Sequence, residues 1–302
     1  MKNIFQKYAA RIILIVLLAG FSRAHLSADP ILGSDLSAFA ILGGAGVAVN
    51  GTGSVISGSV GGCCNAVAVT GYPAGFSDSG GTVFNTGTLP AATETQANAQ
   101  LGTAITALSG MTPTSSEATL NNITLAPGVY SVSATSFSGT LTLDGGGNTN
   151  ALWVFLLASS LTTSSGSDVI VENTGSNAGV YWVMGAGSAT LGSNSTFEGN
   201  ILANVSATAG TNVTDSCGRL LTQTASVTLA GNDTIGIGCS SNGLSGGGTV
   251  NIVNGIPVAT PLPASVPEPG TFFLLGLGLA GLLILRKQLR WSVVPVPQMK
   301  LR

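Results

Sequence analysis

Residues 188–212, SATLGSNSTFEGNILANVSATAGTN, contain one short pattern twice. Each copy places a threonine between two apolar residues, in Ala189-Thr190-Leu191 and in Ala207-Thr208-Ala209, and a Gly-x-Asn turn follows each time. Alternation of apolar and polar residues is typical of a strand with one buried face, and glycine and asparagine favour the turn after it. Thr190 and Thr208 are 18 residues apart, which suits one turn of a β-solenoid.

The pattern continues on both sides of this stretch. Leu161-Thr162-Thr163 precedes it and Val227-Thr228-Leu229 follows it, so the successive intervals between threonines are 28, 18 and 20 residues. The two shorter intervals fit single rungs, and the longest needs an excursion of the chain. Because stacked strands lie about 4.8 Å apart, the threonines are predicted to form a ladder on one outer face. The members of this ladder are Thr162, Thr190, Thr208 and Thr228.

Composition agrees with a mainly β protein. The 302 residues include 43 glycines, only 7% are charged, and 44% are hydrophobic, so the chain can bury a core and is unlike a disordered segment. Three apolar runs are predicted to be strands buried on both faces. They cover residues 152–157, 169–171 and 180–183.

One segment departs from this texture. Residues 91–111 contain no proline and few glycines, and their apolar residues recur at spacings of three and four, which predicts a helix. Glu94 suits the N-terminal end of the helix dipole, and Gly110 is a plausible stop. The predicted apolar stripe, expected to pack along a sheet, consists of Ala97, Leu101, Ala104, Ile105 and Leu108.

Charge and histidine content exclude several functions. Arg219 is the only basic residue between residues 24 and 285 apart from His25, which lies in or beside a predicted signal peptide. Nucleic-acid binding requires cations at the phosphates, so it is not expected. Without a histidine in the mature chain, Ser-His-Asp or Cys-His catalysis and histidine-based metal sites are also not expected. We predict no cofactor and no metal.

The remaining enzyme alternative is a polysaccharide-active β-helix, which needs paired carboxylates. The acidic residues are scattered, and most lie at predicted turns; they are Asp144, Asp168, Glu172, Glu198, Asp215 and Asp233. Glu198 and Asp215 are expected on adjacent rungs, but the nearby Arg219 indicates a structural pair. We therefore predict that the chain is not an enzyme. A cleft with two facing carboxylates would favour the opposite interpretation.

Four cysteines, Cys63, Cys64, Cys217 and Cys239, can form disulfides in an exported protein. Cys217 and Cys239 are 22 residues apart, about one rung, and are a candidate pair. Cys63 and Cys64 are adjacent, so each has a different partner or they bridge each other. The three possible connectivities stay open at this point, and the absence of CxxC spacing argues against a metal site.

The two ends of the chain carry targeting features. Basic residues, an apolar stretch and small residues predict a signal peptide over residues 1–28. Near the other end, Pro267, Glu268 and Pro269 precede an apolar run over residues 272–285, and Arg286-Lys287 follows it. Basic residues after such a run favour keeping that end in the cytoplasm.

This tail, residues 266–287, resembles a PEP-CTERM sorting signal. The resemblance implies export, transient membrane anchoring, recognition by an exosortase-type peptidase, and release or attachment at the bacterial surface. Residues 288–302 extend beyond the usual end of such tails, which weakens the expectation of processing. The predicted organisation is therefore a signal peptide, a domain over residues 29–256, a proline-rich linker over residues 257–265, the sorting segment and a C-terminal tail.

The domain resembles the ice-binding-like family of secreted proteins. The resemblance runs in order from about residue 32 to 238. It is carried by residues 70–75 (TGYPAG), 125–130 (LAPGVY), 160–167 (LTT within a serine-rich stretch), 180–182 (VYW), and 188–203. Ala74 departs from the second proline of the family turn. The resemblance implies a discontinuous, right-handed β-solenoid with one long α-helix alongside.

The family also implies adsorption to ice through a flat outer face rich in threonine and serine. The ladder of four threonines is the candidate for that face, and its partner would be the surface of an ice crystal. The alternative is a structural or adhesive protein of the cell surface or extracellular matrix. Asp215 or Arg219 pointing onto the face would disfavour ice binding.

Overall fold

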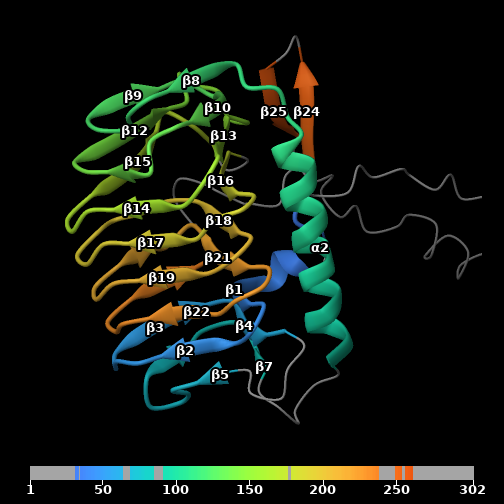
Figure 1. Cartoon of the computed structure of the whole chain (residues 1–302), viewed down its shortest axis with the longest axis vertical. Coiled ribbons are helices and arrows are strands. Elements are labelled where there is room, and N and C mark those ends of the chain that lie inside the picture. The colour runs from blue at the N-terminus through green and yellow to red at the C-terminus, as the bar shows by residue number, and fades with distance from the viewer. Residues whose placement is uncertain are drawn as a thin grey trace, which may run out of the picture. The chain divides into compact units, whose positions relative to one another are not determined.

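The computed structural model describes residues 31–33, 35–63, 69–84, 91–175, 178–237, 249–253 and 256–260. The chain divides into two compact units, residues 1–262 and 263–302, and every described residue belongs to the first. The predicted signal peptide and the predicted sorting segment lie outside the described residues. The first unit is a β-solenoid of parallel strands with one long helix beside it, as predicted (Figure 1).

Three sheets form three faces of the solenoid. Face A is the nine-stranded sheet, and its strands are all paired in parallel. In spatial order they are β7 (Val83–Phe84), β4 (Ser59–Gly62), β1 (Phe39–Gly43), β21 (Arg219–Thr222), β18 (Asn200–Ala203), β16 (Gly179–Met184), β13 (Leu152–Leu157), β10 (Gly128–Val132) and β8 (Ser115–Glu117).

Face B is the seven-stranded sheet, made of strands of two or three residues. In spatial order they are β11 (Ser136–Phe137), β14 (Leu161–Thr163), β17 (Ala189–Leu191), β19 (Ala207–Ala209), β22 (Val227–Leu229), β2 (Val47–Val49) and β5 (Val69–Thr70). Such short strands present one outward residue per rung, because successive side chains point to opposite sides.

Face C consists of two sheets joined by single bridges at Thr196, which pairs with Asp168 on one side and Thr214 on the other. The first contains β9 (Ile123–Leu125), β12 (Thr140–Asp144) and β15 (Asp168–Glu172). The second contains β20 (Thr214–Asp215), β23 (Thr234–Gly236), β3 (Ser54–Ser57) and β6 (Phe76–Asp78).

The solenoid is discontinuous in sequence. Strands β1, β2 and β3, near the start of the chain, pair with β21, β22 and β23, near the end of the domain. Helix α2 (Ala91–Ser109), preceded by the short 3-10 helix η1 (Leu36–Ala38), connects the two parts and runs beside face A (Figure 1). Its 19 residues span about 28 Å, roughly six rung spacings. The chain then resumes at β8, at the other end of the stack.

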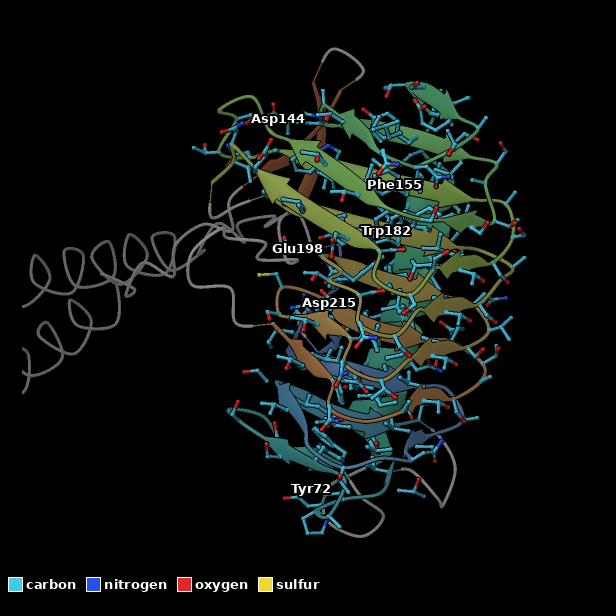
Figure 2. All side chains as sticks on the ribbon, turned by 90° about the vertical axis from the view of Figure 1, so that its left-hand side faces the viewer. Tyr72, Asp144, Phe155, Trp182, Glu198 and Asp215 are labelled. Atoms are coloured by element: carbon cyan, nitrogen blue, oxygen red, sulfur yellow. The ribbon has the colours of Figure 1, made fainter. Side chains whose placement is uncertain are left out.

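Two hydrophobic cores stabilise this arrangement. Inside the solenoid, an aromatic column joins Tyr130, Phe155, Trp182 and Phe197, with ring centroids 4.1 Å apart at the Phe155–Trp182 step (Figure 2). The second core lies between face A and α2. The predicted helical stripe is buried there, with Leu101 fully enclosed. Burial on both sides explains why strands β13 and β16 are almost continuously apolar.

The prediction that residues 169–171 are buried on both faces is wrong. Val169 and Val171 are buried, but Ile170 between them is 43% exposed on the outer side of β15. The reason is that α2 covers face A and not face C, so this strand has only one buried side.

The last two described strands form an antiparallel hairpin beside β10 and β13. They are β24 (Thr249–Val253) and β25 (Ile256–Thr260). Residues 257–260 of the predicted linker therefore lie in a strand. Among the described residues, no helix is long and apolar enough to cross a membrane.

Candidate functional site: an outward row of hydroxyls on face B

The structure places the four predicted threonines in register on face B. Thr162 pairs with Thr190, Thr190 with Thr208, and Thr208 with Thr228. The row continues at both ends, because Ser136 pairs with Thr162, Ala48 with Thr228, and Thr70 with Ala48. We call this seven-rung set the B row: Ser136, Thr162, Thr190, Thr208, Thr228, Ala48 and Thr70. At about 4.8 Å per rung it extends over roughly 29 Å.

The strands hold this row outward because their flanking residues fill the core. In β17, Ala189 and Leu191 are each 1% exposed, whereas Thr190 between them is exposed. Strands β19 and β22 repeat the arrangement, with a half-buried threonine between two buried apolar residues. Every strand of the face therefore has the same inside and outside, which keeps the outer surface regular.

Asparagines fix the corner that follows face B. Asn194, Asn212 and Asn232 have φ angles of 59°, 60° and 55°, in the left-handed region that asparagine tolerates better than most residues. The side-chain amide of Asn212 donates a hydrogen bond to Oδ1 of Asn194 at 2.9 Å. Three successive rungs therefore turn in the same way, as the Gly/Asn turns in the sequence predicted.

The hydroxyls of the threonines differ from those of their neighbours. Among the described residues, the side chains of Thr162, Thr190, Thr208 and Thr228 make no hydrogen bond with the protein, so their hydroxyls face water. In contrast, Ser160 Oγ accepts a hydrogen bond from the N–H of Ser188 at 3.0 Å. The hydroxyl of Ser188 in turn bonds to that of Ser206, also at 3.0 Å. These serines, two residues before each threonine, support the corner between faces A and B.

No strand of face B contains a charged residue. Asp215 and Arg219, which would disfavour ice binding if they pointed onto this face, are 0% and 3% exposed. Arg219 donates hydrogen bonds to Oδ1 of Asn200 at 2.7 Å and to the carbonyl oxygen of Ser37 at 2.8 Å. Neither residue reaches the B row.

Glu198 and Asp215 lie on neighbouring rungs at one edge of the solenoid (Figure 2). Burial raises the pKa of Glu198 to about 7. Burial, and then the charge of Glu198, raise the pKa of Asp215, whose Oδ1 accepts a hydrogen bond from the N–H of Gly199. Because the Asp215 carboxyl is fully enclosed, a substrate in solvent cannot contact it.

The cysteines are partly resolved by the structure. Cys63 and Cys217 are both disulfide-bonded. Cys64 and Cys239 lie outside the described residues, so the pairing of Cys217 with Cys239 stays a prediction. The described residues contain no group of three or more His, Cys, Asp or Glu side chains arranged to hold a metal ion.

Sequence reasoning missed three members of the B row. Ser136 stands in a two-residue strand without a recognisable pattern, and Ala48 has no hydroxyl to mark it. Thr70 was visible only as part of a turn motif. The alternation Val47-Ala48-Val49 is the one local signal that could have placed a rung there.

Comparisons with known proteins agree with this geometry. Residues 41–235 match the family described as Ice-binding-like, and residues 265–288 match the PEP-CTERM protein-sorting motif. An ice-binding protein from Nostoc sp. (strain HG1) is 36% identical over 295 residues, which cover 96% of this chain and 99% of that protein.

Solved structures give the same result. The crystal structure of an ice-binding protein from the Antarctic ascomycete Antarctomyces psychrotrophicus aligns with a TM-score of 0.60 and 36% identity, covering 70% of this chain and all of that chain. A glycosylated ice-binding protein from an Arctic yeast aligns with a TM-score of 0.61 and 27% identity, covering 72% and 97%. The sequence match over most of the domain and the shared solenoid lead to one conclusion: this chain belongs to the Ice-binding-like family.

Proposed function

We propose that this chain adsorbs to ice and that the B row is its contact surface. The relatives it resembles over nearly their whole length are named as ice-binding proteins. The observation that carries the proposal is a row of seven rungs on an open face, free of charge, in which four threonine hydroxyls have no partner among the described residues.

The physical reason is the regularity of this surface. Each threonine offers a hydroxyl that binds water and a methyl that does not, and the rungs repeat them at about 4.8 Å. This repeat is close to the spacing of water molecules along one axis of ordinary ice. Water held over such an array adopts a lattice-like order, and many weak contacts add up across a rigid face. A charged side chain would orient water differently and disrupt that order.

Ice recrystallisation inhibition by the full chain tests the proposal. The wild type is compared with a variant carrying Thr190→Tyr, Thr208→Tyr and Thr228→Tyr. Tyrosine is well tolerated at outward strand positions, so the solenoid is expected to remain folded while three rings interrupt the row. Inhibition by the wild type at micromolar concentration and its loss in the variant are the expected results.

A matched control carries Thr124→Tyr, Thr142→Tyr and Ile170→Tyr. These residues are also outward, on three paired rungs of face C. The control is expected to inhibit recrystallisation as the wild type does. Absence of inhibition by a folded wild type would refute ice binding and leave the structural or adhesive role as the better interpretation. Equal activity in the B-row variant would refute the assignment of the face.

We further propose how the chain reaches the ice. Residues 1–28 act as a signal peptide, residues 29–256 form the exported domain, and residues 257–265 precede the sorting signal. The segment 266–287 would anchor the chain transiently in the membrane until an exosortase-type peptidase acts near Pro267-Glu268-Pro269. The match to the sorting motif supports this route and a location at the bacterial surface.

Cell fractionation in a host with such a peptidase tests the route. Replacing Glu268 by alanine is expected to keep the chain in the membrane fraction at its unprocessed mass. Thr271→Ala, just after the motif, is the control and should be processed normally. Normal release of the Glu268→Ala variant would contradict the proposed role of the motif.

A further inference from the structure

Face C carries a second outward row that none of the predicted site residues includes. Thr196 pairs with Thr214, Thr214 with Thr234, and Thr234 with Val55. Val55 pairs in turn with Ser77. We call these five residues the C row: Thr196, Thr214, Thr234, Val55 and Ser77. It extends over roughly 19 Å at about 4.8 Å per rung.

The C row repeats the geometry of the B row. Thr196, Thr214 and Thr234 each follow a B-row threonine by six residues, and each corner between them contains one asparagine in the left-handed region. The two rows therefore rise together, rung by rung. Because the chain turns at each asparagine, the rows belong to different faces and cannot both lie against one flat surface.

Acidic residues next to the C row are directed into the core. Asp215 follows Thr214 and Asp233 precedes Thr234, and both are 0% exposed. Asp233 accepts hydrogen bonds from the N–H groups of Val213 and Gly231 at 2.9 and 3.0 Å. Burying a carboxyl is costly, and burial raises the pKa of both groups. The result is an outer row without a charged side chain on these rungs.

The C row ends where charge begins. Beyond Thr196 the next residue in register is Asp168, and Asp144 and Glu172 face each other on the same half of face C. On the uncharged half, the hydroxyls of Thr196, Thr214 and Thr234 make no hydrogen bond with other described residues. Val55, at 42% exposure, adds an apolar contact. Helix α2 and the hairpin β24–β25 both lie along face A, whereas the C row lies on an open face.

We propose that the C row is a second ice-binding surface, which engages a different plane of the crystal from that engaged by the B row. This inference rests on the proposed function. Its occupant is the ice lattice, because the row offers the same uncharged hydroxyls and methyls at the same rung spacing and is joined to the B row by a polar, uncharged corner. With five rungs against seven, it is the smaller of the two surfaces.

Fluorescence imaging of a single-crystal ice hemisphere grown with the labelled full chain tests this inference. The wild type is expected to stain two sets of planes. The B-row triple variant should lose one set and keep the other. A C-row variant with Thr196→Tyr, Thr214→Tyr and Thr234→Tyr should show the converse loss. Combining both sets of substitutions should leave the hemisphere unstained.

The Thr124→Tyr, Thr142→Tyr and Ile170→Tyr variant is the matched control, since it places three tyrosines on the charged half of the same face. Thr196→Tyr alone, at the exposed end of the row, replaces the triple variant if that chain does not fold. A C-row variant with wild-type staining, or a B-row variant without any staining, would overturn the second surface and leave the proposed function intact. An unstained wild type would overturn both.

Discussion

Replacing Glu198 by glutamine should remove part of the pH dependence of stability. In the folded protein, burial raises the pKa of Glu198 from 4.5 to about 7. In the unfolded chain the same carboxyl ionises near 4.5. Between these values the unfolded state has released a proton that the folded state still holds, so the free energy of unfolding falls as the pH rises from 4.5 to about 7. Below 4.5 the contribution is fully present.

The size of the effect follows from the pKa. At about 1.4 kcal/mol per pH unit, a pKa raised from 4.5 to about 7 corresponds to roughly 3 kcal/mol. Glu198 is only half-buried, so solvent screening lowers the expected value to about 2 kcal/mol. For a domain of this size, this corresponds to a change in melting temperature of about 4–8 °C. Asp215, whose pKa is also raised, acts in the same direction.

Thermal unfolding of the full chain, followed by circular dichroism near the two ends of this pH range, measures the effect. The Glu198→Gln variant keeps the size of the side chain and cannot ionise, so its melting temperature should fall less on going to high pH. Glu172→Gln, at an exposed position on β15, is the control and should follow the wild type. Identical pH profiles for the wild type and the Glu198→Gln variant would refute the reasoning.

Three further changes test the packing. Trp182→Ala removes the ring stacked 4.1 Å from Phe155 and should cost about 3–5 kcal/mol in urea unfolding; a loss below about 1 kcal/mol would contradict the aromatic column. Leu101→Ala should cost about 2–5 kcal/mol, whereas Thr103→Ala on the exposed side of α2 should stay within about 0.5 kcal/mol, and equal effects would argue against the second core. Asn212→Ala should cost about 1–2 kcal/mol because its φ is 60°, and a fully neutral result would contradict the corner geometry.

Local periodicity was sufficient to predict several elements. The spacing of three and four in residues 91–111 predicted α2, which ends at Ser109, and the alternation around Thr190 and Thr208 predicted two outward rungs. These features depend on which side of a helix or strand is buried, and that side is encoded in neighbouring residues. The prediction of the threonine ladder succeeded for the same reason, since every rung repeats one pattern of inside and outside.

The tertiary structure alone decided what lies beside what. Ala48 pairs with Thr228 although 180 residues separate them, because the chain returns along α2 and stacks its first rungs on its last. Local sequence does not encode this closure, so the full length of the B row was not predictable. In the same way, only the position of α2 explains why Val180–Val183 are buried on both sides while Ile170 is exposed. The sequence by itself determined the rungs and their outward threonines, and the stacking of distant strands decided the length, order and cover of the faces.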